Sequence, residues 1–257
     1  MPLNLQHTQA YMAGFFGFGN PTARWCFVGL EEGGGNHYDQ VEARINSWVD
    51  RNQSPLEDLP EYSAAVGHGL ELWFGDNAVL QSTWNKLIHL LLTAQGQLTD
   101  TVHRRLYQNK NWGRQNSQTI LTDIYPLPSP SRDHWYYDQW VGGAIPALAS
   151  REVYHESIEQ TRLLPLRNLI LSGKCKPRIV VIYALAWNKI RRKLLGKLIG
   201  VGLPEIVPPE DGIWMNKVGQ HLVAIVYQPT RYRTLAYFAK MGLMIRARAN
   251  EIGIPLI

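Results

Sequence analysis

Apolar runs of strand length recur along the chain, and segments with helical periodicity separate them. The four clearest runs cover residues 24–30, 119–125, 178–185 and 222–227. Each run is almost continuously apolar, which is typical of parallel strands buried on both faces of a sheet rather than of strands with one solvated face. The pattern therefore predicts a parallel sheet of about four strands.

Helices are predicted between these strands from apolar residues that recur every three or four positions. Val41, Ile45 and Trp48 predict a helix over about 38–50. Further helices are predicted over about 78–94, over 150–172 with an interruption near Pro165, over the Lys- and Arg-rich stretch 189–197, and from 235 to 252, whereas 51–75 is expected to be irregular.

Strands that alternate with helices predict an α/β fold with right-handed crossovers. We expect a single three-layer αβα domain over residues 1–257, with a central and mostly parallel sheet. The core is expected over 24–252, and residues 1–23, which are rich in Phe and Gly, are expected to wrap it.

Composition narrows the function classes. The 257 residues are 45% hydrophobic, and 26 Lys and Arg against 21 Asp and Glu give a net charge of +5, which permits a polyanionic partner without requiring one.

Two distant cysteines, Cys26 and Cys175, exclude an iron–sulfur cluster and a Cys-rich zinc site, and Cys26 is expected to be a small buried residue. The His residues lack metal-ligand spacing. No signal peptide and no apolar run of about 18 residues is present, so we expect a cytoplasmic protein without a membrane partner.

Candidate chemistry gathers where the first run ends. Glu31 and Glu32 follow the apolar residues directly, and Gly33, Gly34 and Gly35 come next. Ligands of open α/β sheets bind outside the carboxyl ends of the strands, so these residues are site candidates. The alternative is that both glutamates are solvated loop charges.

Three strand-end segments occur in a fixed order: VGLEEG at 28–33, LTDIYP at 121–126 and VYQPTRY at 226–232. This ordered set, over about residues 24–235, resembles the uracil-DNA glycosylase superfamily. In that family the first segment positions the attacking water, the middle one reads the base, and the last contacts the base and the DNA. Three departures stand out: the first segment lacks the usual proline, Asp123 replaces an asparagine, and Gln-Pro-Thr replaces His-Pro-Ser.

The resemblance implies a role for each matching residue. Glu31 would position the water, with Glu32 as the second choice, because a carboxylate also stabilises the oxocarbenium charge that develops on the sugar. Gln228 would donate to the base O2, and Thr230 would bind a phosphate. Tyr232 would fill the space left by a flipped base, unless it only packs at a helix start.

Asp123 points to a cytosine-type base. Cytosine presents an N4 amine donor and a bare N3 acceptor, the reverse of uracil. A carboxyl group whose pKa is raised by burial can accept from N4 and donate its proton to N3. The alternative is that Asp123 only caps the following loop.

The three glycines leave room beside C5 of the base, where uracil enzymes place a bulky residue. Gly33, Gly34 and Gly35 therefore predict a pocket for a 5-substituted cytosine, such as a hydroxymethyl or glucosylated one. Alternatively, they only shape a tight turn or bind a phosphate at a helix start.

The remaining candidates concern stacking and DNA binding. Tyr38, Trp73 and Phe74 are candidates to stack on the base, and Arg132, Arg231 and Arg233 are candidate phosphate contacts. The resemblance implies a DNA glycosylase that needs no cofactor and no protein partner. It would act on double-stranded phage DNA with modified bases, in antiviral defence, and leave an abasic site. A uracil glycosylase of base excision repair and an inactive member that binds nucleic acid or protein are the alternatives.

Overall fold

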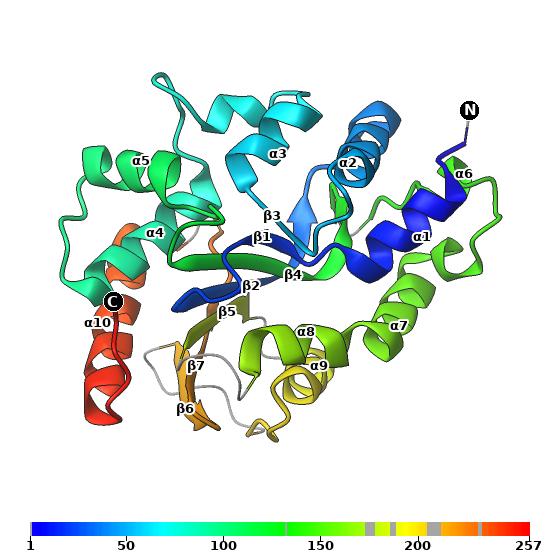
Figure 1. Cartoon of the computed structure of the whole chain (residues 1–257). Helices are drawn as coiled ribbons and strands as arrows, with labels where there is room; N and C mark the ends of the chain where they lie inside the picture. Colours follow the sequence, from blue (N-terminus) through cyan, green and yellow to red (C-terminus); the bar gives the residue numbers. More distant parts are fainter. Residues whose placement is uncertain (1, 132, 173–177, 186–188, 205–211, 231–232) are drawn as a thin grey trace.

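The computed structural model describes residues 2–131, 133–172, 178–185, 189–204, 212–230 and 233–257. Within these residues, seven strands form one mixed sheet in the order β3-β1-β4-β2-β5-β7-β6 (Figure 1). Their bounds are β1 Gly17–Gly19, β2 Trp25–Gly33, β3 Leu56–Glu57, β4 Thr119–Ser129, β5 Ile179–Leu185, β6 Ile213–Val218 and β7 His221–Tyr227. The α/β class is confirmed.

The four predicted strands form the middle of this sheet. They are β4, β2, β5 and β7, which lie side by side and parallel. The expected number of about four strands was too low, because β1 and β3 add to one edge and β6 adds to the other. β1 and β3 are only three and two residues long, and β6 is half exposed and antiparallel to β7, so none of them produces a continuous apolar run.

Two strands extend further than predicted, and both extensions matter for the site. β2 continues through Glu31 and Glu32 to Gly33, and β4 continues through two prolines to Ser129. The two strands pair along this stretch, with an irregularity between Glu31 and Gly33. Among the described residues, β1 pairs with β4 only at Ile120 and Leu121. The two prolines, which have no N–H to donate, lie beyond this part of β4, where no hydrogen bond to β1 is required.

The helices follow the predicted order with additions. Their bounds are α1 Leu5–Gly14, α2 Tyr38–Asp50, α3 Leu59–Val66, α4 Ser82–Gln95, α5 Thr101–Lys110, α6 Tyr137–Trp140, α7 Arg151–Thr161, α8 Leu163–Leu171, α9 Lys189–Ile199 and α10 Leu235–Glu251; short 3₁₀ helices cover Leu70–Trp73 and Pro146–Leu148. The helix over 38–50 is confirmed. α4 begins later than predicted, since the Gln81 side chain caps it by accepting from the Trp84 N–H.

The interruption predicted near Pro165 lies at Arg162, between α7 and α8. Pro165 itself falls in the first turn of α8, where a missing N–H costs no hydrogen bond. The expectation that 51–75 is irregular was wrong, because this stretch contains β3, α3 and a 3₁₀ helix.

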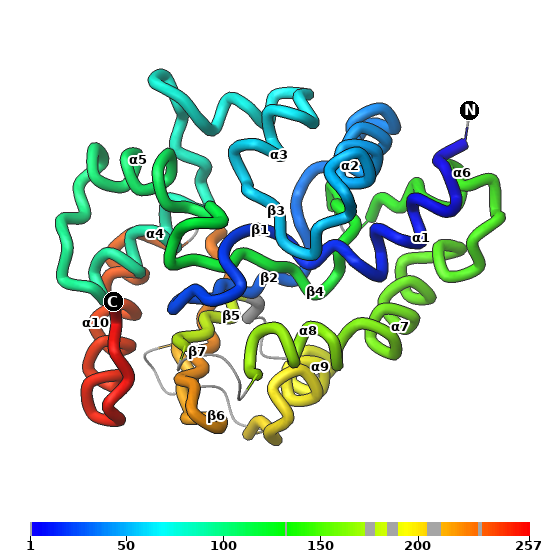
Figure 2. Tube along the Cα trace, in the orientation of Figure 1, coloured from blue at the N-terminus to red at the C-terminus, as the bar shows by residue number. Residues whose placement is uncertain are grey.

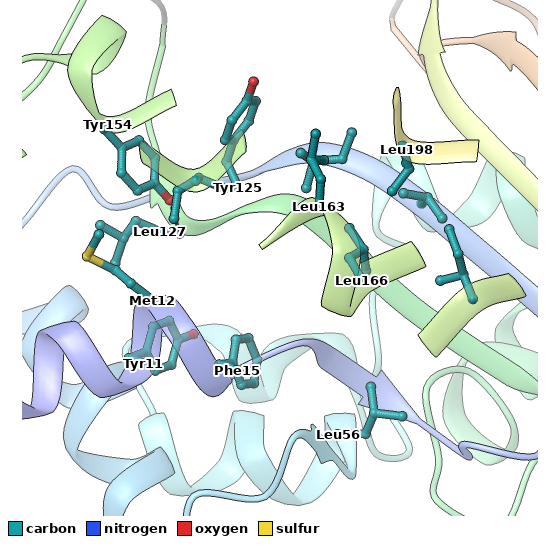
Figure 3. Packing of buried hydrophobic residues seen from close by; sticks show 14 of the residues in the cluster. Tyr11, Met12, Phe15, Leu56, Tyr125, Leu127, Tyr154, Leu163, Leu166 and Leu198 are labelled. Atoms are coloured by element: carbon teal, nitrogen blue, oxygen red, sulfur yellow. Dashed lines mark hydrogen bonds between the residues drawn. The ribbon is translucent and has the colours of Figure 1, made fainter. Parts of the chain in front are cut away.

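The sheet carries a hydrophobic core on each face. One core packs the sheet against α1, α2, α7, α8 and α9, and the other packs it against α4 and α10. Cys26 is fully buried in the first core, as expected. Figure 3 shows α1 residues of this core, including Tyr11 and Met12, facing Leu127 of β4 and Tyr154 of α7. No helix in the described part of the chain is both long and apolar enough to cross a membrane.

The N-terminal segment does more than wrap the core. The chain trace runs from α1 directly into β1, which lies beside β4 (Figure 2). Phe16, just before β1, and Phe18, within it, therefore come close to the first half of β4, which contains the predicted base-reading residue Asp123. Sequence analysis had assigned this segment no part in the site.

Candidate functional site

One large cavity opens at the carboxyl ends of the parallel strands. Its volume is about 1350 Å³. Among the sequence-predicted site residues, those that line it are Glu31, Glu32, Gly33, Gly34, Trp73, Asp123 and Gln228. These residues come from the end of β2 and the loop that follows it, the middle of β4, the loop after β7, and the 3₁₀ helix before α4. The fold therefore brings residues from all three strand-end segments into one space.

The other predicted site residues in the described part of the chain do not line this cavity. Tyr38 donates a hydrogen bond to Glu42 at 2.8 Å and packs edge-on against Trp140. Phe74 packs on Trp84, with ring centroids 5.8 Å apart. Both side chains pack against other protein residues and not into the cavity, so of the three stacking candidates only Trp73 can contact a ligand bound there.

Two DNA-binding candidates, Thr230 and Arg233, belong to the described residues that do not line the cavity. The Thr230 carbonyl accepts a hydrogen bond from Lys86 Nζ at 2.6 Å, and its side chain is exposed. The Arg233 guanidinium lies 4.0 Å over the Tyr227 ring. Arg132, Arg231 and Tyr232, which were also predicted to bind DNA, lie outside the described residues.

Asp123 lies in a row that crosses three adjacent strands. It pairs with Gly29 of β2, and Tyr183 of β5 lies on the other side of that glycine. A Cβ atom at Gly29 would overlap Asp123 Oδ1 and come within 2.7 Å of the Tyr183 hydroxyl oxygen. Gly29 is thus required for Asp123 and Tyr183 to converge, and both side chains line the cavity.

The environment of Asp123 favours the protonated carboxyl. Burial raises its pKa to about 8, and the nearby carboxylates of Glu32 and Glu31 act in the same direction, while Arg162 opposes them. Asp123 therefore carries a proton at neutral pH. This is the condition under which sequence analysis gave Asp123 a proton to donate. The alternative that Asp123 caps a loop is wrong, because the residue lies within β4.

Glu32 is an ion-paired carboxylate with access to solvent. Its Oε2 atom lies 2.6 Å from Nη1 of Arg44, a residue of α2 that is only 2% exposed, whereas the Glu32 side chain is 30% exposed. Arg44 thus fixes the position of Glu32 from the buried side. Arg44 lies on the apolar face of its helix, between Val41 and Ile45. A charged residue at such a position is the sequence feature that could have identified Arg44 as a buried partner of Glu32.

Glu31 is held more tightly and is less accessible. Its Oε2 atom lies 2.6 Å from Arg151 Nη1, and its Oε1 atom lies 3.8 Å from His155 Nε2. The Oε1 and Nε2 atoms are both buried and have no hydrogen-bond partner, so a small movement would join them. His155 in turn stacks on Tyr125 with ring centroids 3.8 Å apart. The alternative that both glutamates are solvated loop charges is wrong, because each belongs to β2 and has an arginine partner.

The three glycines differ in role. A Cβ at Gly33 would meet nothing within 4 Å, so this glycine leaves open space in the cavity. Gly34 and Gly35 have φ values of 108° and 72°, a region that disfavours other residues. A Cβ at Gly35 would also come within 2.6 Å of the Pro128 carbonyl oxygen. The tight-turn alternative therefore holds for Gly35, which does not line the cavity.

Several cavity residues were missed by sequence analysis. They share no local motif, because they come from helices and strands that meet only in the folded chain: Phe16, Phe18, Arg44, Trp84, Tyr125, Arg151, His155, Arg162 and Tyr183. Arg151 and His155 are one helical turn apart on α7, a spacing that also describes any solvated helix face.

The described residues offer no metal centre, since no group of three or more His, Cys, Asp or Glu side chains among them is arranged to hold an ion. No protein-family model matches the chain, and no curated protein sequence matches it either.

Proposed function

We propose that the chain is a DNA glycosylase that hydrolyses the N-glycosidic bond of a flipped, 5-substituted cytosine and leaves an abasic site. The observation that carries this proposal is the pair formed by Asp123 and Glu32. One carboxyl group is protonated and the other is an ion-paired carboxylate, and both face the same cavity. A protonated carboxyl group that can donate a proton and an ion-paired carboxylate in the same site are the usual acid and base of glycosidic bond cleavage.

The proposed reaction assigns each group one step. As the C1′–N1 bond breaks, its electron pair stays on the base, and the Asp123 proton moves to N3. Glu32 stabilises the positive charge on the sugar, orients a water molecule toward C1′, and takes the proton that this water loses. Gln228 lies in the same cavity and would donate its amide N–H to the base O2. The products are the free base and an abasic sugar.

Glu32 takes the role that sequence analysis gave first to Glu31. The reason is accessibility. Both oxygens of Glu31 face protein groups, Arg151 on one side and His155 on the other. Glu32 has Oε2 on Arg44 and is the more exposed of the two, so its second oxygen can meet a water in the cavity.

The dimensions of the cavity support a substituted base. A volume of about 1350 Å³ is above the 300–1,000 Å³ that is usual for small-molecule pockets, and Gly33 leaves open space next to Glu32. Hydroxymethylated and glucosylated cytosines occur in phage DNA, so we propose antiviral defence as the biological role. Trp73, Phe16 and Phe18 are the cavity aromatics that would contact the base or its substituent.

The direct test uses duplex oligonucleotides that carry a single uracil, cytosine, 5-hydroxymethylcytosine or glucosylated 5-hydroxymethylcytosine. After incubation with the protein, alkali cleaves the strand wherever a base has been removed. We expect cleavage only at the substituted cytosines. Cleavage at uracil would make the protein a repair enzyme, and binding without cleavage of any duplex would make it an inactive member of the fold.

A bulky residue at position 33 should exclude the C5 substituent. In Gly33→Leu the side chain enters open space, and the backbone conformation of Gly33 imposes no positive φ. We expect a loss of about 10²-fold or more on the glucosylated substrate and a much smaller loss on the duplex with 5-hydroxymethylcytosine, whose C5 substituent is smaller. Single-turnover rates on both duplexes measure this loss. Gly202→Leu is the matched control, because Gly202 also lies in open space but outside the cavity. Gly219→Leu, in the turn between β6 and β7, cannot serve as a control because the φ of Gly219 is positive. Equal loss on both duplexes would show that position 33 does not discriminate substituents.

A further inference from the structure

Arg162 is a buried cation that forms no ion pair with a carboxylate among the described residues. It lies between α7 and α8, is only 2% exposed and lines the cavity. In the described part of the chain its contacts are a long hydrogen bond from Nη1 to the Met12 carbonyl, at 3.5 Å, and the Phe16 ring, 4.2 Å from the guanidinium carbon. Its Nε atom is buried and has no hydrogen-bond partner in that part of the chain.

Another buried arginine shows what an ordinary structural role looks like. Arg178 is 1% exposed and lies outside the cavity. Its guanidinium donates to the carbonyls of Ala23, at 2.9 Å, and Leu169, at 2.6 Å, and also to that of Pro21. Arg178 thus has the acceptors that a buried guanidinium needs, whereas Arg162 has no acceptor for Nε and no carboxylate partner among the described residues.

An uncompensated buried charge is costly, so it persists where function gains from it. Burial lowers the pKa of Arg162 to about 10, which still leaves the guanidinium charged at neutral pH. A negative charge that appears nearby during the reaction would remove this cost. The ground state would then lack an interaction that the transition state has, and such differential stabilisation accelerates a reaction.

Asp123 is the group that would supply this negative charge. Phe18 of β1 pairs with Leu121, so the antiparallel register carries Phe16 to a place opposite Asp123. The Arg162 guanidinium lies over the Phe16 ring, and both Arg162 and Asp123 line the cavity. Arg162 acts against burial and lowers the pKa of Asp123, and among the described residues no ion pair joins the two side chains.

We propose that Arg162 is a positioning residue for catalysis, whose charge stabilises the Asp123 carboxylate formed when that group protonates the leaving base. The inference rests on the proposed function. As the proton leaves Asp123 for N3 of the base, the new carboxylate is stabilised by the positive charge of Arg162. The carboxylates of Glu31 and Glu32 in β2 repel it. The Tyr183 side chain of β5 lies beside it.

The first test needs no substrate. Carboxyl resonances of ¹³C-labelled aspartate are titrated in the wild type and in Arg162→Met, and Asp123→Asn identifies the signal. Since Arg162 favours the charged form of Asp123, its removal should move the Asp123 midpoint to higher pH. Tyr11 and Tyr154, which also face Arg162, remain neutral in this range because burial raises their pKa. An unchanged midpoint would overturn the inference whether or not the protein cleaves DNA.

The second test measures excision. We expect Arg162→Met to lower the single-turnover rate about 10²-fold, and Arg162→Lys to recover most of it. In an Asp123→Asn background, Arg162→Met should cause no further loss, because its effect passes through Asp123. Additive losses would mean that Arg162 acts elsewhere. Inactivity of the wild type on every duplex would refute the proposed function, and the titration would still decide the electrostatic pairing.

Thermal unfolding separates this role from a structural one. Replacing an unpartnered buried cation by an apolar side chain of similar length should leave the melting temperature of Arg162→Met unchanged or raise it. The matched Arg178→Met should lower it, since three carbonyls lose their donor. A large destabilisation of Arg162→Met, with the titration midpoint of Asp123 unmoved, would assign Arg162 to the structure rather than to the reaction.

Discussion

Asp123→Asn should reduce excision of a 5-substituted cytosine by about 10³-fold while leaving the affinity for the same duplex nearly intact. Asparagine preserves the shape of the side chain and can hydrogen-bond to either base, but it has no proton to transfer. Loss of a general acid costs about 10²–10⁴-fold. Single-turnover rates and equilibrium binding to the uncleaved duplex measure the two effects separately.

The pH dependence gives an independent signature of the same group. Because burial raises the pKa of Asp123 to about 8, the wild-type rate should fall as the pH rises through this value, when the acid loses its proton. The variant should lack this descending limb. Asp76→Asn, at an exposed position outside the cavity, is the matched control and should keep both the rate and the limb. An unchanged base preference and rate in Asp123→Asn would refute the assignment of Asp123 as acid and base reader.

The same group should link stability to pH. The native state holds a proton on Asp123 that the unfolded chain releases above about pH 4. Stability therefore falls as the pH rises from there through about 8, since the native state binds more protons than the unfolded state. Asp123→Asn removes this contribution. We expect the variant to gain melting temperature relative to the wild type at pH 9, with the difference shrinking as the pH falls toward 4.

The central part of the fold was predictable because its signal is local. The four parallel strands are continuous apolar runs, and such a run is enough by itself to indicate a strand buried on both faces of a sheet. The short edge strands β1 and β3 have no such signal, and they form because neighbouring segments place β1 against β4 and β3 against β1. The extension of β4 through Pro126 and Pro128 was equally unpredictable, since it depends on β1 ending early.

The candidate site likewise contains some residues that the sequence predicts and others that it does not. Glu31, Glu32 and Asp123 could be predicted because they directly follow, or lie within, strands that end at one edge of the sheet. The groups that decide their chemistry could not. Arg44 comes from α2 and Arg162 from the junction of α7 and α8, and only the folded chain brings them to the carboxyl groups. This is why the order of the two glutamates changes once their partners are known.

The two glutamates should respond differently to loss of charge. Glu32→Gln should lower the excision rate by about 10³-fold, because the variant cannot accept the proton of the water and no longer stabilises the charge on the sugar. Glu31→Gln should lower it by about tenfold or less, since its oxygens face Arg151 and His155 rather than the cavity water. Rates are measured under single-turnover conditions with saturating protein, so that differences in affinity do not enter.

Both substitutions leave an arginine without its carboxylate, so lost stability must be separated from lost chemistry. Glu57 provides the matched control: it is 2% exposed, its Oε2 atom lies 2.9 Å from Arg51 Nε, and it does not line the cavity. Glu57→Gln should destabilise the fold by an amount comparable with Glu32→Gln, on the order of 1–3 kcal/mol, yet cleave at the wild-type rate per folded molecule. Should Glu31→Gln prove the inactive variant and Glu32→Gln the active one, the water would lie on the Arg151 side of β2. Full activity in both would mean that neither carboxylate takes part, and the proposed hydrolysis would then lack its base.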